Sequence, residues 1–155
     1  MKLSIGFTGT RYGMAPGQRQ ALLDLIDQLL VFPPYTTFPC EVHHGMCVGA
    51  DEDFHRIMRE IPGAHIVGHP GPTWPDGKWS ADVLCDETVE RRPYMRRNAD
   101  IVAAAHVMIA TPFGDEPQAS GWTWSTIRMA LRSVKLNKLY VIGRDGKMLT
   151  NDTLA

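Results

Sequence analysis

The alternation of short apolar runs with amphipathic stretches constrains the fold of this chain more than any other sequence feature. Residues 3–8 form an apolar run that stops at Gly9-Thr10-Arg11, which predicts a strand ending in a tight loop. Pro16 then suits the first turn of a helix. Apolar residues recur at helical spacing after it, namely Ala21, Leu22, Leu25, Ile26, Leu29 and Leu30.

The same alternation continues to the last quarter of the chain. Further strands are expected at residues 41–44, 64–68, 106–110 and 138–142, and further helices around Phe54 to Ile61, at 91–105 and at 124–134. Strands that alternate with crossover helices imply a parallel sheet covered on both faces. We therefore expect an α/β fold, a three-layer Rossmann-like domain with a mainly parallel central sheet of about five strands. Residues 1–155 are expected to form this single domain, with residues 143–155 as a tail.

The composition fits one folded domain and limits the classes of partner that it could bind. The chain has 155 residues, of which 44% are hydrophobic and 21% charged, and this is enough apolar material for a core. Sixteen Lys and Arg against seventeen Asp and Glu give a net charge of -1. Proteins that bind nucleic acid extensively carry a basic excess, so nucleic acid is disfavoured as a partner. The sequence has no apolar run long enough to span a membrane and no signal-peptide pattern at its start, which predicts a cytoplasmic location without membrane contact.

Cysteine and histidine usage predicts neither disulfides nor a metal. The three cysteines are an odd number and form no CxxC pair, so a disulfide framework is not expected. His43, His44, Cys47 and His55 lie near one another in the sequence, but their spacing matches no tetrahedral zinc pattern. We expect no metal and no cofactor.

Small and polar residues gather where three predicted strands end. These segments are Gly9-Thr10-Arg11, residues 45–51, and the stretch from Thr111 to Thr126. Ligands of open parallel sheets bind outside the carboxyl ends of the strands. Each segment leads into a helix N-terminus, where free amides and the helix dipole favour an anion. The first strand is not followed by GxGxxG, and the chain contains no GxxxxGK[ST]. The sequence therefore has neither the dinucleotide-binding fingerprint nor a P-loop.

Three features near these segments have two interpretations each. Asp51 is either the cap of the following helix or an acceptor for a ribose hydroxyl or base. The basic cluster at 91–98 is either a solvated face or a source of one or two ligand contacts, because neighbouring helical residues face different ways. The Pro-, Gly- and Trp-rich segment 69–90 is either a solvated excursion or a lid or wall beside the site.

Five motifs in this order resemble the SLOG superfamily. They are the segments 5–11, 44–51, 96–102, 108–112 and 120–130, and the resemblance extends over residues 3–143. This Rossmann-like group includes the LOG phosphoribohydrolases, the DNA-processing protein A domain and the YspA-like proteins. The resemblance implies a nucleotide or nucleotide-derived ligand at the carboxyl edge of the sheet, with an Arg-Asn pair at Arg97 and Asn98. The LOG enzymes have a catalytic Glu where this chain has Thr126, which argues against phosphoribohydrolase activity.

The loops and the resemblance together define a set of candidate ligand-binding residues. It comprises Gly9, Thr10, Arg11, Gly45, Gly49, Ala50, Asp51, Arg97, Asn98, Thr111, Gly121, Thr123 and Thr126. No catalytic residue is assigned.

Three functions remain open at this point. The first is a binding module that senses or sequesters a nucleotide. The second is an N-glycosidic hydrolase or transferase, in which another carboxylate serves as the acid, with Glu90, Glu116, Asp51 and Asp86 as candidates. The third is single-stranded nucleic-acid binding, with Trp74, Trp79, Trp122 and Trp124 as stacking platforms. Small domains of this type often pair through exposed helix faces, so a homo-oligomer is compatible with each of them.

Overall fold

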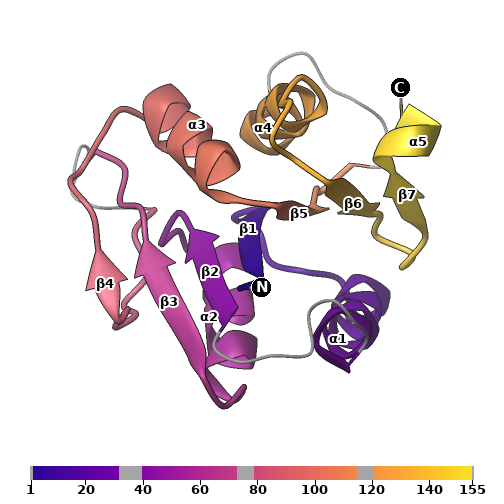
Figure 1. Cartoon of the computed structure of the whole chain (residues 1–155), viewed down its shortest axis with the longest axis horizontal. Helices are drawn as coiled ribbons and strands as arrows, with labels where there is room; N and C mark the ends of the chain where they lie inside the picture. Colours follow the sequence, from indigo (N-terminus) through magenta and orange to yellow (C-terminus); the bar gives the residue numbers. More distant parts are fainter. Residues whose placement is uncertain (1, 32–39, 73–78, 115–120, 155) are drawn as a thin grey trace.

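The computed structural model describes residues 2–31, 40–72, 79–114 and 121–154, and its central element is a seven-stranded sheet (Figure 1). The strands are β1 (Ser4–Gly9), β2 (Cys40–His44), β3 (Ala64–Gly68), β4 (Glu87–Thr88), β5 (Val107–Thr111), β6 (Lys138–Ile142) and β7 (Met148–Thr150). Their order is β4-β3-β2-β1-β5-β6-β7, and all neighbours pair in parallel except β6 and β7. The switch in strand order therefore falls at β1, between β2 and β5.

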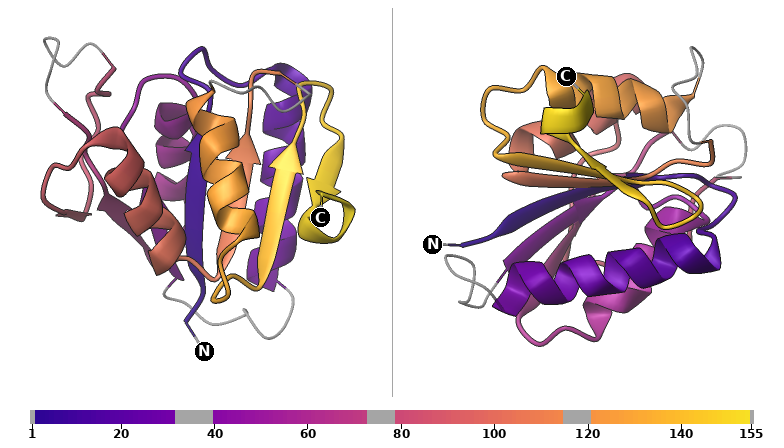
Figure 2. Two further views of the ribbon diagram at one scale, coloured as in Figure 1. Left: turned by 90° about the horizontal axis from the view of Figure 1, so that it is seen from above. Right: turned by 90° about the vertical axis from the view of Figure 1, so that its right-hand side faces the viewer.

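Helices cover both faces of this sheet. They are α1 (Pro16–Val31), α2 (Ala50–Arg59), α3 (Tyr94–Ala104), α4 (Trp122–Leu131) and the short α5 (Asn151–Leu154). Figure 2 shows α1 and α2 on one face and α3 and α4 on the other, which gives the three layers predicted from the sequence. The α/β, Rossmann-like fold with a mostly parallel sheet is thus confirmed.

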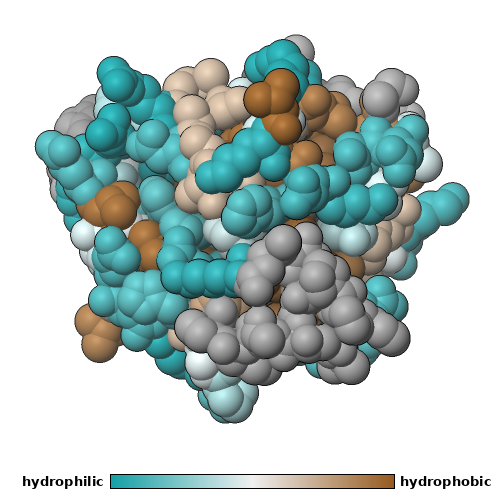
Figure 3. Space-filling model, in the orientation of Figure 1, coloured by the Kyte–Doolittle hydropathy of each residue, from teal (hydrophilic) through white to brown (hydrophobic). Residues whose placement is uncertain are grey.

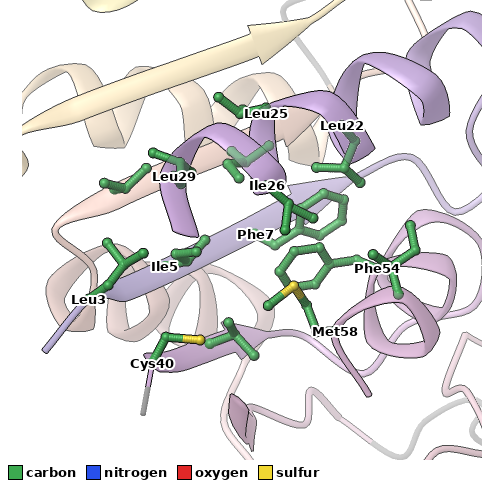
Figure 4. Packing of buried hydrophobic residues seen from close by; sticks show 14 of the residues in the cluster. Leu3, Ile5, Phe7, Leu22, Leu25, Ile26, Leu29, Cys40, Phe54 and Met58 are labelled. Carbon is green, nitrogen blue, oxygen red and sulfur yellow. The ribbon is translucent and has the colours of Figure 1, made fainter. Parts of the chain in front are cut away.

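Two apolar clusters fix the layers. On the α1 and α2 face, the rings of Phe7 from β1 and Phe54 from α2 stack with centroids 4.3 Å apart, and Leu22 and Ile26 of α1 pack nearby (Figure 4). On the other face, Ile101 of α3 and Ile127 of α4 are buried in a second cluster, given by Ile101, Val102, Ala105, Met108, Ala110, Trp124, Ile127, Ala130, Leu139 and Val141. Burial of such side chains is the main stabilising contribution to the fold.

The surface differs from this interior. Among the coloured residues of the face in Figure 3, most are hydrophilic.

Two strands were not predicted, which is why the sheet has seven strands rather than about five. β4 consists of two exposed residues inside segment 69–90, so no apolar pattern in the sequence predicts it. β7 lies in residues 143–155, expected as a tail, where a turn with Gly146 at φ 86° folds the chain back onto β6.

The helix expected at 124–134 is shifted in the structure. α4 begins at Trp122 and ends at Leu131, so Val134 lies beyond it. The helical spacing of apolar residues at 124–134 predicts that Val134 faces inward, but Val134 is fully exposed, so that prediction is wrong. None of the helices in the described part of the chain has both the length and the apolar character needed to cross a membrane.

Candidate functional site

A cavity of about 410 Å³ opens at the carboxyl edge of the sheet, beside the switch in strand order. Its walls come from the loops after β1, β2 and β5, the first turns of α3 and α4, and Trp79. Nine of the thirteen candidate residues line it, namely Gly9, Thr10, Arg11, Gly45, Asp51, Arg97, Asn98, Gly121 and Thr123. The predicted convergence of the three segments on one place is therefore present in the structure.

Four candidate residues lie behind the cavity wall. The Ala50 amide donates to the Thr10 carbonyl at 2.9 Å, and the Thr111 carbonyl accepts from the Thr10 amide at 3.0 Å. Gly49 adopts φ 87°, and its α-carbon packs against the Arg11 backbone. The Thr126 hydroxyl donates to the Trp122 carbonyl within α4. Gly49, Ala50 and Thr111 therefore hold neighbouring loops together, Thr126 bonds within its own helix, and none of the four is among the residues that line the cavity.

Most amides of the 45–51 loop are already hydrogen-bonded within the protein. The Gly45 and Cys47 amides donate to Asp51 Oδ2 at 3.0 and 3.3 Å, and the Met46 amide donates to His44 Nδ1. The Val48 amide donates to the Trp79 carbonyl. The prediction that this segment offers free amides to an anion is thus wrong for these four residues, because Asp51, His44 and the Trp79 carbonyl already accept their hydrogen bonds.

Asp51 is not the cap of α2, the first of its two predicted roles, while its role as an acceptor for a ribose hydroxyl or base stays a prediction. The N-cap of α2 is Gly49, without a side-chain capping bond, because the Asp51 carboxylate binds the upstream amides of Gly45 and Cys47. Burial raises the pKa of Asp51 to about 6, although the nearby Arg97 charge acts in the opposite direction. The cavity wall therefore contains a buried carboxyl group that titrates near neutral pH.

The N-termini of α3 and α4 lie at the cavity without capping side chains. Their N-caps, Pro93 and Gly121, make no side-chain capping bond, and neither helix has an acidic residue in its first turn. The first turn of α2 instead contains three acidic residues, Asp51, Glu52 and Asp53. Because the first amides of a helix lack intrahelical partners, α3 and α4 present donors and positive dipole ends where α2 presents negative charge.

Two arginines line the cavity in different ways. Arg11 lies over the Trp79 ring, with Cζ 4.1 Å from the ring centroid. Arg97 is buried, and its Nη1 donates to the Gly45 and His69 carbonyls while its Nε donates to Asn98 Oδ1. Arg97 therefore joins α3 to the ends of β2 and β3. Of the two arginines, Arg11 is the better placed to contact a ligand in the cavity.

The rest of the basic cluster points away from the cavity. Arg91 donates to the Gly71 carbonyl, Arg92 pairs with Asp100, and Arg96 is exposed. Only Arg97 and Asn98 of residues 91–98 reach the cavity together with Tyr94. This agrees with the expectation that helical geometry allows few of these side chains to face one ligand.

Sequence reasoning named the tryptophans of the cavity as stacking platforms but missed the aromatic side chains of Tyr12, Tyr94 and Phe113. Tyr12 and Phe113 meet edge to face with centroids 5.6 Å apart, and Tyr94 and Trp122 lie 5.4 Å apart. All four residues line the cavity. Their position in the sequence could have indicated them, because Tyr12 and Phe113 each come within two residues after a segment at which a predicted strand ends. Trp79 also lines the cavity, so part of segment 69–90 forms a wall, while Trp74 lies outside the described residues.

One histidine and cysteine cluster lies away from this cavity. Nitrogen atoms of His44 and His55 and the sulfur of Cys85 lie within 4.8 Å of one another. His44 Nδ1 accepts from the Met46 amide, so neutral His44 holds its proton on Nε2, which donates to His55 Nδ1 at 2.9 Å. This bond accounts for the two histidines as a buried hydrogen-bonded pair.

The structure separates the four acidic candidates for an acid role. Asp51 lines the cavity, whereas Asp86 binds the Ile66 amide and Arg59 on another surface. Glu90 is exposed and is not part of the cavity wall. Glu116 lies outside the described residues.

The fold and the cavity define an α/β, Rossmann-like protein with a candidate ligand site at the carboxyl edge of its sheet. Comparisons with protein-family models, curated proteins and solved structures gave no match. The functional argument therefore rests on the geometry of the cavity.

Proposed function

We propose that this protein binds a nucleotide or nucleotide-derived ligand at the carboxyl edge of its sheet and acts as a sensor or sequestering module. The observation that carries the proposal is that two helix N-termini without acids or side-chain caps, those of α3 and α4, open on one cavity. Helix N-termini bind phosphate groups through their amides and dipoles. The resemblance of the five sequence motifs to the SLOG superfamily supports the same ligand class.

The cavity residues suit the two chemical parts of such a ligand. Thr123 lies in the first turn of α4 and adds a hydroxyl donor, and the Arg11 guanidinium adds a forked, charged donor for phosphate oxygens. Aromatic rings of Tyr94 and Trp122 lie beside these donors. A cavity that combines anion donors with aromatic rings favours a ligand with a phosphate and a planar group.

Isothermal titration calorimetry tests the proposal with nucleoside monophosphates, cyclic nucleotides and ADP-ribose. We expect at least one of these compounds to bind, and Arg11→Gln to weaken its binding by about tenfold through the lost charge-assisted hydrogen bond. Arg19→Gln is the matched control because Arg19 is exposed on α1 and should leave affinity unchanged. Absence of binding by every compound would contradict the proposal.

N-glycosidic hydrolysis is the second candidate function, and the position of Asp51 favours it. Asp51 is the only acidic residue among the described residues that line the cavity, and its pKa of about 6 suits proton transfer near neutral pH. We expect this activity to release free base from nucleoside monophosphates and to be lost in Asp51→Asn. Chromatographic detection of the base decides this, and unchanged release in the variant would exclude Asp51 as the acid.

Single-stranded nucleic-acid binding remains a prediction. Trp79, Trp122 and Trp124 line the cavity, and Trp124 is buried with its Nε1 donating to the Gly114 carbonyl. A titration with labelled oligonucleotides at low salt would show whether these rings also serve as stacking platforms.

A further inference from the structure

Exposed aromatic side chains are concentrated at the cavity. Among the described residues, the exposed large hydrophobic side chains are Tyr12, Leu84, Met95, Phe113, Trp122 and Val134. Of the aromatic members, Tyr12 is 72% exposed, Phe113 is 55% exposed and Trp122 is 47% exposed. All three line the cavity. Clustered apolar surface that stays exposed marks an interaction site, so these rings require an explanation that core packing does not supply.

Tyr12 and Phe113 are held in place although they are exposed. They lie in the loops that follow the neighbouring strands β1 and β5, and their rings meet at an interplanar angle of 67°. The Arg144 guanidinium lies 4.8 Å from the centroid of the Phe113 ring. Just before Phe113, the Pro112 carbonyl accepts a hydrogen bond from the buried side chain of Gln18. A fixed, solvent-facing ring pair is a preorganised stacking surface, because little side-chain entropy is lost when it binds a flat group.

We propose that the Tyr12–Phe113 pair is the base subsite of the cavity and stacks against the planar heterocyclic base of the ligand. This inference rests on the proposed function and adds to it the residues that recognise the base. Aromatic stacking suits any base, because every base has a π-face. The subsite therefore contributes affinity for a base as a class.

The division of the cavity wall places the base at this pair. Amide donors for phosphate come from the first turns of α3 and α4, where Tyr94 and Trp122 are also found. Tyr12 and Phe113 belong instead to the loops after β1 and β5, in which Arg11, next to Tyr12 in the chain, is the charged phosphate donor proposed above. A ligand whose phosphate lies at the helix N-termini thus leaves the strand-loop part of the wall for its base.

The test compares two ligands that differ by the base, a nucleoside 5′-monophosphate and ribose 5-phosphate, on the full chain. Phe113→Ala is expected to weaken the nucleotide by about tenfold, within the range measured for lost base stacking, and to leave ribose 5-phosphate unchanged. Tyr12→Ala should act in the same direction, and Phe113→Trp should retain nucleotide affinity. Leu84→Ala is the matched control, since Leu84 is exposed but is not part of this cavity.

The outcomes separate this inference from the proposed function. Equal losses for both ligands in Phe113→Ala, or no loss for either, would overturn the base subsite. Equal affinity of the wild-type protein for ribose 5-phosphate and the nucleotide would overturn it as well, while phosphate binding would stand. If the wild-type protein binds neither these two ligands nor any other compound of the calorimetric series, the proposed function itself fails. Unfolding temperatures of the variants show that a loss of binding is not a loss of fold.

Discussion

Arg97 and Asp51 are joined through a single peptide unit, that of Gly45. Arg97 Nη1 donates to the Gly45 carbonyl at 2.7 Å, and the Gly45 amide donates to Asp51 Oδ2 at 3.0 Å. Both charged side chains are buried at the cavity wall. Because buried charges need partners, this peptide links the guanidinium of α3 to the carboxylate of α2 and fixes the inner wall of the cavity.

Gly45→Ala is expected to disrupt that link. A β-carbon at position 45 would lie 2.6 Å from Arg97 Nη1 and 3.0 Å from Asp51 Oδ2, so the buried Arg97 side chain must move. We expect a loss of stability of about 2 kcal/mol, typical of a disturbed buried hydrogen-bond network, measured by denaturant unfolding. Gly121→Ala is the control, because no atom of the described residues lies within 4 Å of its β-carbon position, and it should cost only the preference for glycine at a helix N-cap, about 1 kcal/mol or less. Equal effects of the two substitutions would contradict the argument.

Gly49→Ala tests the contact between the first two loops. Gly49 and Gly13 have nearly the same positive φ, at 87° and 88°. A β-carbon at Gly49 would clash with the Arg11 backbone, whereas a β-carbon at Gly13 would meet no atom of the described residues within 4 Å. We expect Gly13→Ala to cost about 1 kcal/mol for the left-handed conformation alone, and Gly49→Ala to cost clearly more in denaturant unfolding. A Gly49→Ala protein as stable as Gly13→Ala would show that the loops can separate freely.

Asp51 should make the stability depend on pH in an unusual direction for a carboxylate. Its folded pKa is raised from 3.8 to about 6 by burial, so the folded state binds a proton more readily than the unfolded state. The stabilising contribution is complete below pH 3.8 and is lost as the pH rises through about 6. We expect Asp51→Asn, which cannot ionise, to gain stability relative to the wild-type protein between pH 4 and 7, by on the order of 2 kcal/mol. Unfolding temperatures that run parallel across this range would refute it.

The buried histidines make the stability depend on pH in the opposite direction to Asp51. Burial lowers the pKa of His44 to about 3 and that of His69 to about 4. The folded state therefore resists protonation more than the unfolded state, and this stability is lost as the pH falls from 6.5 toward 4. We expect His69→Gln to show a shallower loss of unfolding free energy over this interval than the wild-type protein. Identical slopes would mean that His69 does not contribute to acid sensitivity.

The sequence allowed much of the fold to be predicted, because its apolar patterns are regular. β3 and β6 coincide with the predicted ranges 64–68 and 138–142, and α1 begins at Pro16 as the sequence suggests. β4 has no such pattern, because its pairing with β3 involves only Glu87 and Thr88. A two-residue strand is defined by its neighbour and not by its own side chains.

The site was less predictable, because its details depend on tertiary contacts. Glycine positions indicated which loops meet, but not where each amide points. The Gly45 and Cys47 amides bind Asp51 within their own loop, while the open amides belong to α3 and α4. Tyr12 and Phe113 meet across two loops that lie a hundred residues apart in the chain, and no local pattern reports such a pair.

Gln18 is the positioning residue behind the proposed base subsite, and its role can be tested. Its Nε2 donates to the Pro112 carbonyl at 2.9 Å and to the Ile142 carbonyl at 2.8 Å, and its Oε1 accepts from the Ala15 amide. Gln18 is fully buried, so Gln18→Ala leaves these groups without their partners. We expect a cost of about 2–3 kcal/mol and weaker nucleotide binding, because the loop that holds Phe113 loses its support.

The matched control for this prediction is Gln20→Ala on the same helix. Gln20 is exposed and bonds only to the exposed Asp24 among the residues with described contacts, so its removal should cost less than about 0.5 kcal/mol. Denaturant unfolding gives the stability difference, and calorimetry with a nucleoside monophosphate and ribose 5-phosphate gives the binding difference. If Gln18→Ala is destabilised but keeps its preference for the nucleotide over ribose 5-phosphate, then Phe113 holds its position without Gln18 and the assigned positioning role is wrong.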